Sequence, residues 1–353
     1  MRQLSRYISI SVLGAITLVL LVIVAIDAIG AINDGRGDIA KEYTFKQVVI
    51  YVALTLPARI YEHLPMSSLI GCLIGLGVLA NNSELVVMRA AGLSVLRIVG
   101  LVLKPILVII LLGSLLGEYV VPYTDQYAES RRMLLKGGKT AQESVSGFWN
   151  KEGNEFMHFN AVYPGGVLFG VTRYQFDDQH VLQQSSFAGR ASFQGDHWVE
   201  ELGAVTHFLG DRTEVTTFIT RDWNTKLSPE LLNLIVLPPE SLAMRGLREY
   251  SNYLEDQGQN AAKYKLVFWG KALQPLTIIS LVLIAISFIF GPLREVTMGY
   301  RVFAGVVVGL VFRTSQDLLG PASIVFGFSP LLAVAFPAII CCLIGVILLR
   351  RAS

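Results

Sequence analysis

Charged residues are scarce in this sequence, and cysteine is almost absent. Asp, Glu, Lys and Arg make up 16% of the 353 residues, apolar residues make up 53%, and the mean hydropathy is +0.53. Soluble domains usually carry about 25% charged residues. We therefore expect a polytopic membrane protein. The net charge of +2 is too small to indicate nucleic acid or another polyanionic partner for the whole surface.

The three cysteines, Cys72, Cys341 and Cys342, all lie in long apolar runs. The region between the third and fourth runs contains none, so the sequence indicates no disulfide framework there. We expect the three thiols to pack inside the membrane-spanning part.

Motifs of catalysis and nucleotide binding are missing as well. The segment KGGKT, Lys136 to Thr140, has Met133 where a phosphate-binding loop needs glycine. The five histidines have no metal-ligand spacing, and no G-x-S-x-G motif is present. We therefore expect a chain without catalytic activity or a cofactor of its own. If it drives an energetic process, the energy is supplied by another protein.

Apolar runs long enough to cross a bilayer, which takes about 20 helical residues, occur at six places. They are residues 8–30, 60–80, 98–121, 272–291, 302–320 and 331–349. The first run is longer than the apolar part of a signal peptide, about 7–15 residues. It is therefore interpreted as a retained anchor, and the chain as having six transmembrane helices.

The distribution of Lys and Arg predicts the orientation of the spans. Arginines that would share one side of the membrane are Arg2, Arg6, Arg89, Arg97, Arg294, Arg301, Arg350 and Arg351. On the other side, the first predicted loop, 33–59, mixes basic with acidic residues, and the last loop, 320–330, has no basic residue. Both termini are therefore expected in the cytoplasm.

The residues between spans three and four have a different character. Short alternating segments such as GVLFGVTRYQF, SSFAGRASFQ, HWVEELGAVTHFL and TEVTTFIT are separated by Gly-, Asp- and Pro-containing turns. We expect an inserted periplasmic β-sandwich, similar to a jelly roll, over about 145–237, followed by a connecting helix. The predicted organisation is 1–122 with three spans, 123–260 as the periplasmic domain, and 261–353 with three spans.

A short apolar segment, NNSELVVMRAAGLS, connects the second and third spans and predicts a helix at 83–93. Ser83 can cap this helix, and Glu84 in its first turn interacts favourably with the helix dipole. The apolar residues around it cover most of its circumference, which indicates burial. One interpretation is docking into a groove of another protein through Glu84, Leu85, Met88 and Arg89; the other is simple capping.

Three segments carry a resemblance to a known family. SELVVMRAAGLS, GEYVVP at 117–122 and FIFGPLREVTMGYR at 288–301 resemble the lipopolysaccharide-export ABC permeases of the LptF/LptG family, and more its LptG branch. The resemblance extends over essentially the whole chain. It implies ATP-driven extraction of lipopolysaccharide from the bacterial inner membrane, toward the outer membrane. The short helix would then be the coupling helix that meets the ATPase.

The resemblance also implies the partners. They are an LptF-like permease in a heterodimer, two copies of an LptB-like cytoplasmic ATPase that binds ATP and Mg²⁺, and LptC-like and LptA-like periplasmic jelly-roll proteins. Lateral gates in the family involve spans one and five. Two rival interpretations are a secondary transporter, which should show inverted repeats, and a static scaffold that displays the β domain.

Lipopolysaccharide carries phosphates, which bind well to guanidinium and ammonium groups. Arg131, Arg132 and Lys136 follow span three, where the family has basic residues, although a solvated helix face is the alternative. Arg36 and Lys41 follow span one, but they match the family pattern less well. We expect these five residues to bind the lipid head group.

Span five contains an arginine and an aspartate four residues apart, Arg313 and Asp317. Ionisable residues within a span are rare and face protein or water. The two side chains could form a structural pair, adjust contacts of a gate, or touch the lipid head group.

Overall fold

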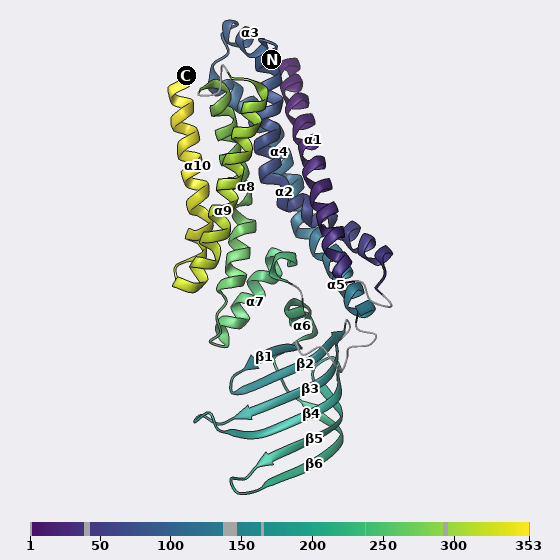
Figure 1. The fold of residues 1–353 in the computed structure, drawn as a ribbon. Coiled ribbons are helices and arrows are strands. Elements are labelled where there is room, and N and C mark those ends of the chain that lie inside the picture. Colours follow the sequence, from purple (N-terminus) through teal and green to yellow (C-terminus); the bar gives the residue numbers. More distant parts are fainter. Residues whose placement is uncertain are drawn as a thin grey trace. The chain divides into compact units, whose positions relative to one another are not determined.

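The computed structural model describes residues 2–38, 43–136, 147–163, 166–236, 238–291 and 296–352. The chain forms two compact units (Figure 1). The helical unit comprises Met1–Ala128, Ala243–Arg248 and Ala262–Ser353, and the sheet unit comprises Glu129–Leu242 and Glu249–Ala261.

Six helices among the described residues are long and apolar enough to cross a membrane, which confirms the predicted spans. The helices of the helical unit are α1 (Arg2–Asp34), α2 (Phe45–Asn81), α3 (Glu84–Ala90), α4 (Val95–Leu115), α8 (Ala262–Phe290), α9 (Met298–Phe326) and α10 (Pro330–Ala352). In Figure 1, α3 and both ends of the chain lie at the same end of this helix bundle.

The second span begins much earlier than its hydropathy indicates. Residues 45–59, expected in a loop, form the first turns of α2. Their polar side chains lower the hydropathy, but Val48 and Val52 are buried one turn apart, the spacing of a packed helix face. Pro57 and Pro65 lie inside the helix, as transmembrane helices tolerate when neighbouring helices surround them.

The third span continues as a helix past residue 121, where its apolar run ends. The π-helical turn η2 (Leu116–Val120) joins α4 to α5 (Val121–Lys136). A Cβ atom at Gly117 would overlap the ring of Tyr61 on α2, so glycine permits this close approach. In the same turn, an oxygen of Glu118 accepts a hydrogen bond from the backbone N–H of Met244, at 2.9 Å.

The interior of the helical unit lies along α2 and α8. These two spans have 67% and 61% of their apolar window buried, against 17% for α9. Buried residues of α1, α3 and α4 pack into the same apolar cluster. Two helices thus form the centre, and the others are arranged around them.

The sheet unit contains one antiparallel sheet whose six described strands follow sequence order. The strands are β1 (Phe148–Glu152), β2 (Glu155–Tyr163), β3 (Val167–Phe176), β4 (Leu182–Phe193), β5 (Trp198–Phe208) and β6 (Thr213–Trp223). The expected antiparallel β domain is confirmed, and each of the four quoted segments forms a strand. The described strands pair as a single meander.

One line across the sheet interrupts the strand pairing. The skipped residues in β2 to β6 are Asn160, Gly170, Gly189, Leu202 and Ile219. Gly170 and Leu202 have positive φ values of 60° and 54°, a conformation that costs free energy for leucine. The interruption changes which face a side chain reaches. Leu168 and Val171, three residues apart, are therefore both in the core.

The core of the sheet unit contains two tryptophans. Trp198 and Trp223 are buried with their ring centroids 6.0 Å apart, and the indole N–H of Trp198 donates to the Leu227 carbonyl at 2.7 Å. The helix α6 (Pro229–Val236) contributes Leu232 to this core. Residues 229–236 were expected in the β domain, but they are helical because a proline starts a short apolar helix that covers the core. The predicted connecting helix is α7 (Met244–Asp256).

A buried ionic network lies in the same sheet. Glu200 is fully buried and accepts hydrogen bonds from Arg221 Nη2, at 2.6 Å, and from Arg173 Nη2, at 3.2 Å. Arg173 also contacts Glu155 at 2.9 Å. Two carboxylates and two guanidinium groups balance one another, as buried charges require.

Truncation of Trp198 should destabilise the sheet unit strongly. Trp198→Ala removes a side chain that is 1% exposed, so we expect the free energy of unfolding to fall by about 3–5 kcal/mol. The matched control is Trp149→Ala, because Trp149 is 59% exposed. The free energy of unfolding of both variants is measured by chemical denaturation of the purified chain, with proteolytic cleavage within the sheet unit as the signal of unfolding. Equal losses in the two variants would contradict the assignment of Trp198 to the core.

Candidate functional site

The short helix α3 has one buried and one exposed side. Leu85 and Met88 are buried in the apolar cluster of the helical unit, whereas Val86 and Val87 are 56% and 66% exposed. The helix is therefore attached to its own chain through one side. The other side presents valines to the exterior.

The first turn of α3 differs from the expected capping. Ser83 adopts a left-handed conformation, φ 60° and ψ 8°, and its side chain makes no capping hydrogen bond. The prediction that Ser83 caps the helix is wrong, because the turn after α2 places this residue in a conformation from which a cap cannot form. The Glu84 carboxylate instead accepts from the Tyr7 hydroxyl of α1, at 3.1 Å, and from the Asn82 amide, at 3.5 Å.

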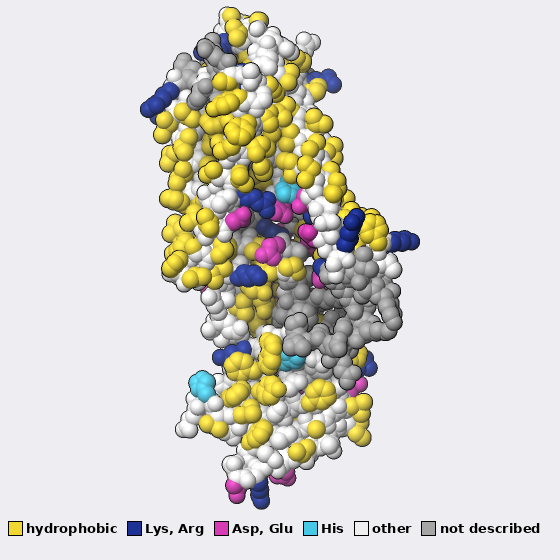
Figure 2. Space-filling view, viewed as in Figure 1, with side chains coloured by type: hydrophobic (Ala, Val, Ile, Leu, Met, Phe, Trp, Pro, Cys, Tyr) yellow, Lys and Arg dark blue, Asp and Glu magenta, His cyan; other side chains and the backbone are white. Residues whose placement is uncertain are grey.

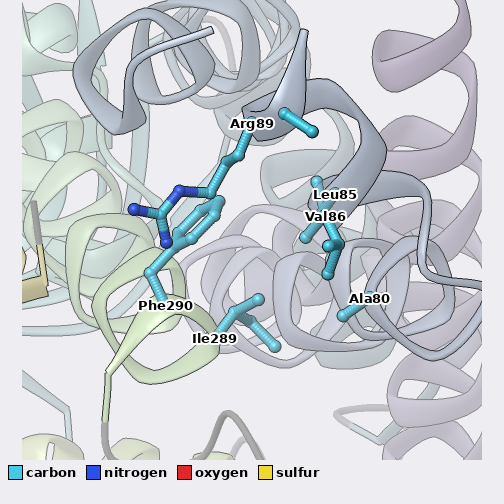
Figure 3. Close-up of a pocket in the computed structure, with 7 residues that line it drawn as sticks. Ala80, Leu85, Val86, Arg89, Ile289 and Phe290 are labelled. Carbon is cyan, nitrogen blue, oxygen red and sulfur yellow. The ribbon is translucent and has the colours of Figure 1, made fainter. Parts of the chain in front are cut away.

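A cavity of about 330 Å³ lies between α3, the end of α2 and the end of α8. It is lined by Ala80, Leu85, Val86, Arg89, Ala90, Ile289 and Phe290. Figure 3 shows the Arg89 side chain of α3 and the Phe290 ring of α8 among the residues that line it. The walls are largely apolar, and the guanidinium group stands at one side.

The pair expected in span five is part of a larger group. Arg313 Nη2 donates to Glu62 Oε1 of α2 at 2.5 Å, and its Nε lies 3.8 Å from Asp317 Oδ2. Sequence reasoning missed Glu62, because it is 251 residues away from Arg313 in the chain. Arg313 therefore has two carboxylate partners, one on its own helix and one on α2.

A second charged group joins α1 to α2. Arg59 of α2 forms a salt bridge with Asp27 of α1, and His63 Nε2 lies 3.7 Å from the same carboxylate. Figure 2 shows acidic and basic side chains gathered in one zone of an otherwise apolar face of the helical unit. Within the described ranges, no three His, Cys, Asp or Glu side chains are placed to hold a metal ion.

The five expected head-group residues are spread along two segments. Arg131 and Arg132 lie partly buried in the last turns of α5, with Arg132 Nη1 3.9 Å from Glu129, and Lys136 is the last residue of that helix. Arg36 is exposed in the short 3₁₀ helix η1 (Gly35–Asp38). Lys41 and most of KGGKT lie outside the described residues.

Comparison with known proteins decides the family. The family model described as "Lipopolysaccharide export system permease LptF/LptG" matches residues 6–351. The chain belongs to the LptF/LptG family. It is similar to the lipopolysaccharide export system permease protein LptG of Haemophilus influenzae, with 35% identity over 96% of this chain and 95% of the relative. The LptG protein of Escherichia coli K12 is 34% identical, over 99% of this chain and 98% of the relative.

Membership of the LptF/LptG family establishes the general role. The chain is a multi-pass permease subunit of the lipopolysaccharide export system, and it is the non-catalytic transmembrane component. This role replaces the two rival interpretations, a secondary transporter and a static scaffold. The resemblance of SELVVMRAAGLS and the other quoted segments was therefore a correct indication.

Proposed function

We propose that this permease couples ATP hydrolysis by a separate ATPase to the extraction of lipopolysaccharide from the inner membrane. It would act in a heterodimer with an LptF-like permease, above two LptB-like ATPase subunits that bind ATP and Mg²⁺. LptC-like and LptA-like proteins would receive the lipid in the periplasm. The observation that carries the proposal is α3, whose exposed valines lie at the bundle end that also holds both termini.

The docking surface of α3 is divided between two tasks. The buried Leu85 and Met88 fix the helix to its own permease, while the exposed Val86, Val87 and Arg89 would contact the ATPase. The Glu84 carboxylate accepts from Tyr7 through Oε1, and a carboxylate has about four acceptor positions. Glu84 can therefore also accept from an arginine of the ATPase.

Reversal of the Glu84 charge should uncouple ATP hydrolysis by the ATPase from lipid movement by the permease. Glu84→Lys places two cations in one contact, and mismatching a desolvated charge pair commonly costs about 2–5 kcal/mol. We expect ATPase docking to weaken by about 30-fold or more, Glu84→Gln to be milder, and lipid binding to persist. Lipid-dependent ATP hydrolysis of the purified complex is the measurement.

A charge-swap experiment identifies the partner of Glu84. The Glu84→Lys permease is combined with ATPase variants in which single groove arginines are changed to glutamate. Recovery of hydrolysis in one combination identifies the arginine. Unimpaired transport by Glu84→Lys with the unmodified ATPase would leave Glu84 only its contacts with Tyr7 and Asn82.

The orientation of the chain can be measured by thiol labelling. We expect both termini and α3 in the cytoplasm and the sheet unit in the periplasm, because the arginines follow the positive-inside rule. Single cysteines replace Gln3, Ser94 or Gln179, all exposed, after the native cysteines are removed. In intact spheroplasts an impermeant reagent should label only position 179. Labelling of position 94 but not 179 would invert the topology.

The basic residues of α5 are proposed to bind the lipid phosphates. Photo-crosslinkers at positions 131, 132 and 136 should capture lipopolysaccharide, and replacement of the three residues by alanine should reduce export without loss of subunit assembly. The matched control is Arg190, an exposed arginine of β4. Crosslinking at 131, 132 and 136 that is no stronger than at 190 would favour an ordinary solvated helix face. Arg36 and Lys41 are expected to contribute less.

A further inference from the structure

The span α9 is held to the rest of the helical unit by unusually little apolar packing. Only 17% of its apolar window is buried, against 67% for its neighbour α2. In a bilayer, apolar side chains gain little by leaving lipid, so helix association depends on close packing and polar contacts. The few polar contacts of α9 therefore have a large influence on its position.

One face of α9 has a regular arrangement of four residues. Arg301, Gly305, Gly309 and Arg313 follow at intervals of four, which places them along one side of the helix. The two glycines are buried against α2: a Cβ at Gly305 would overlap Leu73, and one at Gly309 would lie 3.4 Å from Leu69. The middle of this face is thus smooth, with an arginine at each end.

The two arginines bind α2 in different surroundings. Arg301 is 3% exposed, and its Nη1 donates to Asn81 Oδ1 at 3.0 Å and to the Gly77 carbonyl at 3.4 Å. Asn81 is the last residue of α2, directly before the turn that leads to α3. Arg313, 46% exposed in its side chain, binds Glu62. The two contacts are about 18 Å apart along α9, at 1.5 Å per residue.

We propose that Arg301 is the pivot and the Glu62–Arg313 ion pair the latch of an α9 helix that swings on α2. A buried arginine whose Nη1 group donates to a backbone oxygen and an amide oxygen is costly to displace. An exposed ion pair contributes much less and can exchange its partners for water. Between them, Gly305 and Gly309 allow the two helices to approach closely, with Leu73 and Leu69 of α2 packed against the α9 backbone.

The pivot lies beside the proposed coupling helix. Displacement of α3 by the ATPase would pull on Asn81 and thereby on Arg301, and α9 would transmit this movement to the latch. This step deepens the proposed function and depends on it. Glu62 and Arg313 are accordingly positioning residues, and the excess of negative charge around Arg313, which faces both Glu62 and Asp317, makes it a poor site for a lipid phosphate.

The test measures movement at both ends of the α2–α9 contact. Spin labels are introduced in the cysteine-free chain, within the assembled complex. The outer pair is at positions 53 and 318, and the inner pair is at positions 78 and 303; all four residues are exposed. We expect Glu62→Gln to broaden the outer distance distribution and to leave the inner one unchanged. The population with a separated outer pair should rise about two- to fivefold, as for removal of an exposed ion pair.

Two further variants make the experiment specific. Asp317→Asn should have a smaller effect, because Asp317 lies 3.8 Å from Arg313 while Glu62 lies at 2.5 Å. The double variant Glu62→Arg, Arg313→Glu should restore the narrow outer distribution that each single reversal broadens. Unchanged outer distances in Glu62→Gln, equal broadening of both pairs, or failure of the double variant to restore the distribution would each overturn the proposal.

ATP hydrolysis separates this proposal from the proposed function. In the Glu62→Gln complex, hydrolysis without lipopolysaccharide should approach the rate with lipid, because the latch no longer resists the swing. If the complex of the unmodified chain hydrolyses ATP at the same rate with and without lipopolysaccharide, the proposed function is contradicted. The distance measurements would still test the pivot at Arg301 and the latch at Glu62 and Arg313.

Discussion

Charged side chains among the spans pair with one another or face water, because hydrocarbon stabilises them poorly. The helical unit satisfies this constraint through α2. Arg59 of this helix binds Asp27 of α1, and one turn later Glu62 binds Arg313 of α9. The most buried span therefore also determines where two of the least buried spans lie. Arg59 lies in the first half of α2, which hydropathy alone assigns to a loop, and Glu62 lies just beyond it.

Features that depend on local sequence patterns could be predicted, whereas features that depend on contacts between distant segments could not. Span positions and strands follow from local patterns, namely apolar runs of bilayer length and alternation of period two. The apolar character of SELVVMRAAG correctly indicated a short helix. Contacts between distant segments leave no local pattern, so Glu62 was missed as the partner of Arg313. Ser83 was assigned a capping role from residue type alone, but capping depends on backbone angles that the preceding turn imposes.

Two features of the sheet unit could not be predicted because they depend on the whole sheet or the whole core: the line of skipped residues and the helix α6. The line of skipped residues through β2 to β6 requires all five strands to deviate at matching positions. A glycine such as Gly170 is compatible with such a deviation, but Leu202 with φ 54° gives no sequence signal. The helix α6 likewise exists because the tryptophan core needs a cover, and its eight residues are too few to be stable alone.

The bond between Glu118 and the backbone of Met244 has a consequence for the evolution of such permeases. It joins two parts of the helical unit, the end of span three and the start of α7, that are 126 residues apart in the chain. An inserted domain whose ends meet can be exchanged without strain on its host. A sheet unit from another family member, grafted together with its residues 249–261, would leave the geometry of the spans intact. The sheet unit and the spans could therefore diversify independently.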